Sequence, residues 1–272
     1  MFSVLLYSYH EPREWFDCMG LALVPVGLVG VTLVLIAVQG IICVLMAAPF
    51  ALALAALGGA LGYAIQARHW RPKQTPAMFS ILILLVPAWF GAERAAALRP
   101  PVYEVRTAIE VNAPTKKVWN EAVAFADIPP PKELLFRSGV AYPIRSEITG
   151  HGVGAVGAVR QCIFSTGPFV EPIEVWDEPH LLKFGVTASP APLNELTPYG
   201  HIDAPHLHGY FVSEEGQFLL TALPGGRTRL EGATWYHNAM WPATYWHWWS
   251  DYIIRKIHSR VLEHIRAQAE SR

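Results

Sequence analysis

The sequence predicts an α+β protein in two parts. About three transmembrane helices precede a soluble domain of antiparallel strands that ends in a long helix. Three observations support this. The 47 residues Met19–Ile65 contain no Asp, Glu, Lys, Arg or His. From Val102 onwards, segments of alternating apolar and polar residues are separated by Gly and Pro, which is typical of strands. In the last stretch, 242–268, apolar residues recur every four positions, which indicates an amphipathic helix.

The uncharged run is too long for one membrane span. At about 1.5 Å rise per residue it would form roughly 70 Å of helix, about twice the ~30 Å hydrocarbon core. Gln39 and Gly40 mark the natural turn, which gives predicted spans of about 19–38 and 41–65. A second uncharged run predicts a shorter third span at about 76–92. A buried or interfacial helix is the alternative there, because the run is near the lower length limit for spanning.

Basic residues predict the orientation. Arg68, Arg71 and Lys73 lie between the second and third spans, and positive charge marks cytoplasmic loops. With three spans, the soluble domain then lies on the non-cytoplasmic side. We therefore expect an integral membrane protein, with the lipid bilayer as one partner.

Composition changes at Arg99-Pro100-Pro101. We place the membrane region at 1–101 and the soluble domain at 102–272, where about 170 residues suffice for one hydrophobic core. The net charge of -1 and the pI of about 6.8 show no basic surface suited to nucleic acid, so we expect no nucleic-acid partner. Cys162 is the only cysteine of the soluble domain, which excludes a disulfide within it.

The soluble domain has a recognisable order of predicted elements. A strand at 102–111 is followed by a helix at 116–125 and a short helix at 133–138. Strand-like segments follow at 144–149, 158–165, 170–176, 181–188, 217–223 and 228–236. In the final helix, 242–268, the apolar stripe is Tyr245, Trp249, Ile253, Ile257, Val261 and Ile265.

This order resembles the START-like superfamily, also called SRPBCC, and within it the polyketide cyclase/dehydrase-type proteins of bacteria. The residues that carry the resemblance are 109–114 with Val118-Trp119, 176–179 with 182–184, and the hairpin 223–230. The resemblance covers about residues 103–268, and its motifs are structural rather than catalytic. It implies a helix-grip fold, in which a curved antiparallel sheet wraps around the C-terminal helix and leaves an apolar cavity. No resemblance carries over to the membrane spans, and we expect the membrane to be a bacterial inner membrane.

Candidate ligand-cavity residues come from the strands and from the aromatic-rich start of the last helix. Alternation places Arg160, Cys162 and Phe164 on one face of their strand, although either face can be the inner one. Large aromatic side chains suit a cavity for apolar ligands. The predicted cavity residues are Arg160, Cys162, Phe164, Glu171, His208, Trp235, Tyr236, Tyr245, Trp249 and Ile253.

The histidine-rich segment invites comparison with a metal site. His201, His206 and His208, with Asp203, lie in a long Pro-rich loop, but their spacing matches no standard zinc pattern. We predict no metal and no cofactor, and a loop of this length is often functional, for instance as a cavity lid. No dinucleotide fingerprint, phosphate loop or nucleophile elbow is present in the sequence.

Two functions remain open. The first is a membrane-anchored protein that binds a lipid or other apolar small molecule in the cavity. The second is a cyclase/dehydrase-type enzyme acting on an apolar substrate, with Arg160, Glu171 and His208 converging inside the cavity. Two ionisable side chains in the cavity would favour the enzyme, and an all-apolar cavity the carrier. We prefer the carrier. A weaker third hypothesis is an interaction module docked on its own spans.

Overall fold

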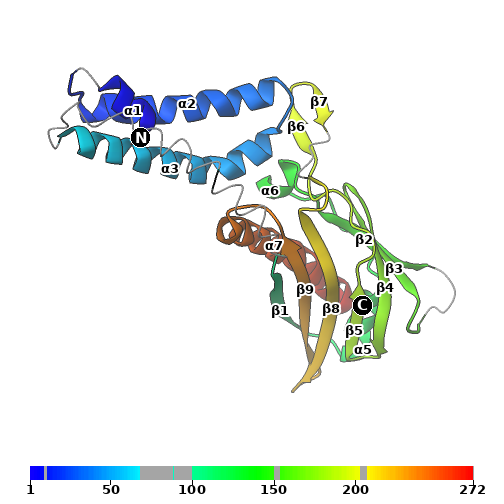
Figure 1. Cartoon of the computed structure of the whole chain (residues 1–272). Helices are drawn as coiled ribbons and strands as arrows, with labels where there is room; N and C mark the ends of the chain where they lie inside the picture. Colours follow the sequence, from blue (N-terminus) through cyan, green and yellow to red (C-terminus); the bar gives the residue numbers. More distant parts are fainter. Residues whose placement is uncertain (9–10, 68–87, 89–99, 150–153, 203–206, 272) are drawn as a thin grey trace. The chain divides into compact units, whose positions relative to one another are not determined.

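The computed structural model describes residues 1–8, 11–67, 88, 100–149, 154–202 and 207–271. They form two compact units, Met1–Arg99 with Leu196–Ile202, and Pro100–Glu195 with Asp203–Arg272. Figure 1 shows the elements. The helices are α1 (Phe2–Tyr7), α2 (Trp15–Leu35), α3 (Ile41–Ala67), α5 (Thr115–Val123), α6 (Leu134–Arg137) and α7 (Ala243–Ser271). The strands are β1 (Val102–Val111), β2 (Pro143–Thr149), β3 (Val159–Phe164), β4 (Gly167–Asp177), β5 (Leu181–Gly185), β6 (Glu195–Thr197), β7 (Gly200–Ile202), β8 (Phe211–Leu223) and β9 (Arg227–Asn238).

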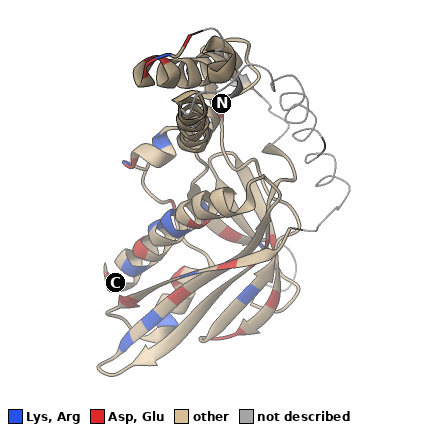
Figure 2. Cartoon of the chain, turned by 60° about the vertical axis from the view of Figure 1, so that its left-hand side comes forward, with Lys and Arg blue, Asp and Glu red and all other residues tan. Residues whose placement is uncertain are grey.

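In the N-terminal unit, α2 and α3 are long and apolar enough, by length and composition, to cross a membrane. The helix α2 begins at Trp15, ahead of the uncharged run, because Asp17 lies in the first turn, where negative charge is favourable. The third predicted span, 76–92, lies outside the described residues apart from Ala88. Figure 2 shows α3 without charged residues, whereas α7 and the strands of the sheet carry both signs.

Small residues allow close packing between the N-terminal helices. Val4 of α1 is buried beside Cys18 and Ala22 of α2. A Cβ atom added to Gly62 of α3 would lie 3.0 Å from Val4, so a larger side chain could not be accommodated without movement. This contact is the close approach that small residues permit between apolar helices.

The second unit contains a seven-stranded antiparallel sheet in the order β1-β9-β8-β5-β4-β3-β2. The long hairpin β8–β9 lies between β1 and β5, and Gly225 and Gly226 of its turn have φ of 80° and 71°, which glycine adopts without strain. The short pair β6–β7 forms a separate sheet within the long Pro-rich loop that contains His201, and its residues Leu196–Ile202 are grouped with the N-terminal unit. Its strands were not predicted, because three residues are too few for a visible alternation.

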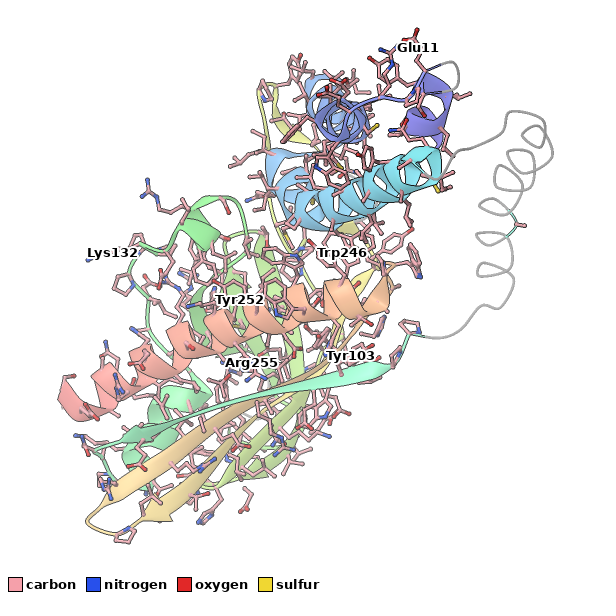
Figure 3. All side chains as sticks on the ribbon, turned by 90° about the vertical axis from the view of Figure 1, so that its left-hand side faces the viewer. Glu11, Tyr103, Lys132, Trp246, Tyr252 and Arg255 are labelled. Carbon is pink, nitrogen blue, oxygen red and sulfur yellow. The ribbon has the colours of Figure 1, made fainter. Side chains whose placement is uncertain are left out.

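The helix α7 lies along the sheet, with Tyr103 of β1 beneath its first half (Figure 3). The main core lies between the sheet, α5 and α7, and Trp119, Leu230 and Ile265 are almost fully buried in it. A curved antiparallel sheet around a long C-terminal helix is the predicted helix-grip arrangement, so the predicted α+β fold class is confirmed. Two of the three predicted membrane helices, α2 and α3, lie among the described residues.

Candidate ligand-binding site

The second unit has a partly open cavity of about 120 Å³ between the sheet and α7. An engineered apolar cavity of about 150 Å³ in another protein holds benzene, so this space corresponds to about one six-membered ring. Most of its wall is aromatic or aliphatic. The phenylalanines that line it are Phe125, Phe164, Phe169, Phe184, Phe211 and Phe218, and the apolar residues from α7 are Ile254, Ile257, Val261 and Leu262.

Two glycines on the central strands leave room for the cavity. Gly216 of β8 and Gly232 of β9 both line it. A Cβ at Gly216 would lie 2.5 Å from the ring of Phe184 and would clash. A Cβ at Gly232 would lie 3.6 Å from Leu262, which is an ordinary van der Waals contact. A methyl group at Gly232 would therefore enter the cavity without displacing its walls.

A buried ion pair forms the charged part of the wall. Arg160 of β3 and Glu171 of β4 are directly opposite in the ladder and are only 2% and 6% exposed. The Nη1 group of Arg160 donates to Oε2 of Glu171, and its Nε donates to the carbonyl of Val123 at 3.1 Å. Its guanidinium also lies 5.2 Å from the ring centroid of Phe184. Each charge is thus compensated by its partner, although the pair is shielded from water.

The pKa values around this pair follow from its burial. Desolvation raises the pKa of Glu171, while the charge of Arg160 lowers it. Desolvation and the charge of Glu171 raise the pKa of Cys162 to about 12. The charge of Arg160 lowers this pKa but does not outweigh them. Since the thiolate is the reactive form of cysteine, Cys162 is a protonated wall residue and not a nucleophile at neutral pH.

The second polar part of the wall is His258 of α7, which the sequence analysis missed. Its Nε2 lies 2.8 Å from the Oγ1 atom of Thr234, and its Nδ1 lies 3.2 Å from the Oγ1 atom of Thr107. Desolvation, reinforced by Arg255, lowers the pKa of His258 to about 4. The imidazole is therefore neutral at pH 7.

The face of α7 that lines the cavity differs from the predicted stripe. A spacing of four residues advances about 400° around a helix, so the stripe from Tyr245 to Ile265 winds about 200° around it. The cavity is instead lined at three- and four-residue spacing, by Ile254, Ile257, His258, Val261 and Leu262. Tyr245, Trp249 and Ile253 are not among its lining residues, because they lie where the predicted stripe has turned away. A search for the three- and four-residue pattern would have found His258.

The other predicted site residues fall in several places. Arg160, Cys162, Phe164 and Glu171 line the cavity together. Trp235 lies on the face of β9 opposite Thr234, with the Nζ of Lys183 5.9 Å from the centroid of its ring. His208 lines an adjoining pocket of about 250 Å³, together with Pro190 and Leu207, and this pocket shares Val186 and Phe211 with the cavity.

Tyr236 is fully buried but belongs to a neighbouring polar cluster. Its hydroxyl lies 2.7 Å from both Oδ1 of Asp251 and Nδ1 of His247, and Tyr103 stacks on His247 at 3.9 Å between ring centroids. Desolvation and the hydrogen bond to Asp251 raise the pKa of Tyr236. The cluster joins the first half of α7 to β1 and β9 (Figure 3).

Among the described residues, no group of three or more His, Cys, Asp or Glu side chains is arranged to hold a metal ion. Asp203 and His206 lie outside the described residues, so the prediction for the histidine-rich segment stays a prediction.

No protein-family model matches the sequence, and no curated protein matches it. Solved structures similar to this chain include ones of the Bet v1-like or SRPBCC kind. Norcoclaurine synthase from Thalictrum flavum is 14% identical, over 62% of this chain and 94% of that chain, with a TM-score of 0.39. ZhuI aromatase/cyclase from Streptomyces sp. R1128 is 14% identical, over 63% and 96%, with a TM-score of 0.42. Ara h 8.0201 is 14% identical, over 63% and 100%, with a TM-score of 0.40. At these identities and TM-scores the matches carry no functional argument.

Proposed function

We propose that residues 102–272 bind one small, largely apolar molecule of about the size of a single ring. The observation that carries this proposal is the cavity of about 120 Å³ with six phenylalanine rings in its wall. Protein interiors are otherwise close-packed, and an apolar void forfeits contacts that a ligand restores. An acyl lipid would extend well beyond this volume, whereas a single-ring molecule fits within it, and we therefore propose a small molecule.

The proposal includes attachment to a membrane. The helices α2 and α3 have the length and apolar composition of spans, and they precede the binding domain in the chain. The basic residues Arg68, Arg71 and Lys73 favour a cytoplasmic loop after α3, and the predicted third span at 76–92 then puts the binding domain on the non-cytoplasmic side. A reporter fused after Arg272 that is active only in the cytoplasm would contradict this orientation.

The test of binding uses toluene as the probe and the full-length protein in detergent. Toluene is titrated while the methyl NMR signals of Ile254, Ile257 and Leu262 are followed. In the wild type we expect these signals to shift with saturation. Gly232→Ala fills part of the cavity, and the cost of overpacking, about 1–3 kcal/mol, weakens binding by about fivefold or more.

Ala108→Val is the matched control, because it adds apolar volume at an exposed position of β1 that does not line the cavity. Detergent takes up toluene equally in every sample, so partitioning does not affect the comparison. Equal shifts in wild type and Gly232→Ala, or no saturable shift in the wild type, would contradict the proposal.

An enzyme is the second candidate, and one observation favours it. Arg160, Glu171 and His258 line the same cavity, so the wall is not all-apolar. Against it, Arg160 and Glu171 are paired with each other, and both ring nitrogens of His258 contact threonine hydroxyls. The arrangement therefore satisfies its polar groups internally, which favours a binding protein.

Enolisation distinguishes the two candidates, because removal of a proton next to a carbonyl begins cyclisation chemistry. Cyclohexanone is a one-ring ketone whose α-protons exchange with deuterium when the enol forms. An enzyme would accelerate this exchange in wild type and lose the acceleration in Glu171→Gln, since the amide is not a base. We expect exchange at the background rate in both proteins, and a Glu171-dependent acceleration would establish the enzyme.

A further inference from the structure

Thr234 is a cavity residue with hydrogen-bonding capacity left for a ligand. It lines the cavity from β9, and its cross-strand neighbour on β8 is Gly216, which has no side chain to cover it. Its hydroxyl contacts Nε2 of His258 and has a further donor or acceptor capacity, since a hydroxyl offers one hydrogen and two lone pairs.

The chain of hydrogen bonds continues to the opposite side of the imidazole. His258 contacts Thr107 of β1 through Nδ1, and Thr107 does not line the cavity. A neutral imidazole has one N–H donor and one lone pair, so one threonine accepts from the ring and the other donates to it. Either tautomer leaves Thr234 able to bond a ligand, as a donor in one case and as an acceptor in the other.

We infer that Thr234, oriented by His258, is the polar recognition point of the cavity and that the ligand carries a neutral hydroxyl group on its ring. This inference rests on the proposed function. A hydroxyl both donates and accepts, so it complements Thr234 in either tautomer. A charged group is disfavoured because the charges that line the cavity are already paired, Arg160 with Glu171 and Glu215 with Lys183.

Ser213 of β8 and the Arg160–Glu171 pair also line the cavity and are the competing recognition points, and the variants separate them from Thr234. Thr234→Val removes the hydroxyl at the cavity and one hydrogen-bond partner of His258. Thr107→Val removes the other partner of His258 but leaves the cavity wall unchanged. The two variants therefore perturb the imidazole similarly, and only Thr234→Val removes a group that lines the cavity.

The experiment compares phenol with toluene, which have similar size and differ by a hydroxyl in place of a methyl. Binding to the full-length protein is followed by the methyl signals of Ile254 and Leu262. Wild type and Thr107→Val should prefer phenol by about fivefold or more, which corresponds to one hydrogen bond of about 1 kcal/mol. Thr234→Val should lose this preference while it still binds toluene.

Each outcome has a distinct meaning. If wild type binds neither compound, the proposed function fails. If toluene binds but phenol is not preferred, or if the preference survives in Thr234→Val, the inference fails while the proposed function stands. A preference that disappears equally in Thr107→Val and Thr234→Val would also overturn the inference, because it would then arise from the position of His258 and not from the hydroxyl of Thr234.

Discussion

The ion pair Arg160–Glu171 and the imidazole of His258 are stabilised in the cavity wall in opposite ways. Arg160 and Glu171, on β3 and β4, keep their charges and compensate each other across the ladder. His258, on α7, lies between two threonines and has a lowered pKa, so it carries no charge at neutral pH. An apolar cavity can therefore hold a polar side chain in two ways: its charge is paired with an opposite charge, or the side chain carries no charge. The two solutions respond differently to mutation and to pH.

Breaking the charged pair should have the largest effect. Glu171→Gln leaves the Arg160 guanidinium without a counter-charge in a site where both residues are almost fully buried. We expect a loss of about 3–5 kcal/mol in the free energy of unfolding, measured by denaturation of the full-length protein. Replacing both partners, by Arg160→Met with Glu171→Leu, should recover most of this loss. A loss under about 1 kcal/mol in the single variant would show that the pair is not isolated from water.

The neutral group should respond to pH instead. The pKa of His258 is about 4 in the folded protein against an ordinary value of 6.5, so the unfolded chain takes up the proton first as the pH falls. Stability that is fully present above pH 6.5 is lost progressively down to about pH 4, by roughly 3 kcal/mol in total.

His258→Gln isolates this contribution, because it cannot titrate and keeps hydrogen-bonding capacity toward the threonines. The difference in unfolding free energy between wild type and variant should therefore change between pH 6.5 and 4. A pH-independent difference would mean that the imidazole is charged in the folded protein, or open to solvent.

The smallest expected effect concerns Gly232, which lines the cavity from β9. Gly232→Ala should leave stability unchanged or raise it by up to about 1 kcal/mol, because alanine restricts the unfolded chain and its methyl meets Leu262 at an ordinary distance. Thermal unfolding of the full-length protein measures this. A marked destabilisation would show that the cavity has no room for the methyl group.

The sequence predicted the charged pair better than the neutral group, for a physical reason. Strand alternation is strict, so Arg160, Cys162 and Phe164 share a face wherever the strand begins. Helical periodicity is not a whole number, so an assumed spacing of four residues includes Ile257 and Val261 of the cavity wall together with Trp249 and Ile253, and it misses Ile254 and His258. The fold was predictable because its elements are long and regular. The cavity depends on Gly216 and Gly232, whose effect appears only when the strands are paired.

We propose above all that one ring-sized molecule binds between the sheet and α7. A crystal structure of the full-length protein with 4-bromophenol tests it most directly, because the anomalous signal of bromine locates the compound without ambiguity. We predict a bromine peak inside the cavity, with the ring against Phe184 and Phe218 and its hydroxyl within hydrogen-bonding distance of Thr234. Bromine peaks confined to other sites, with side chains filling the space between the sheet and α7, would contradict the account.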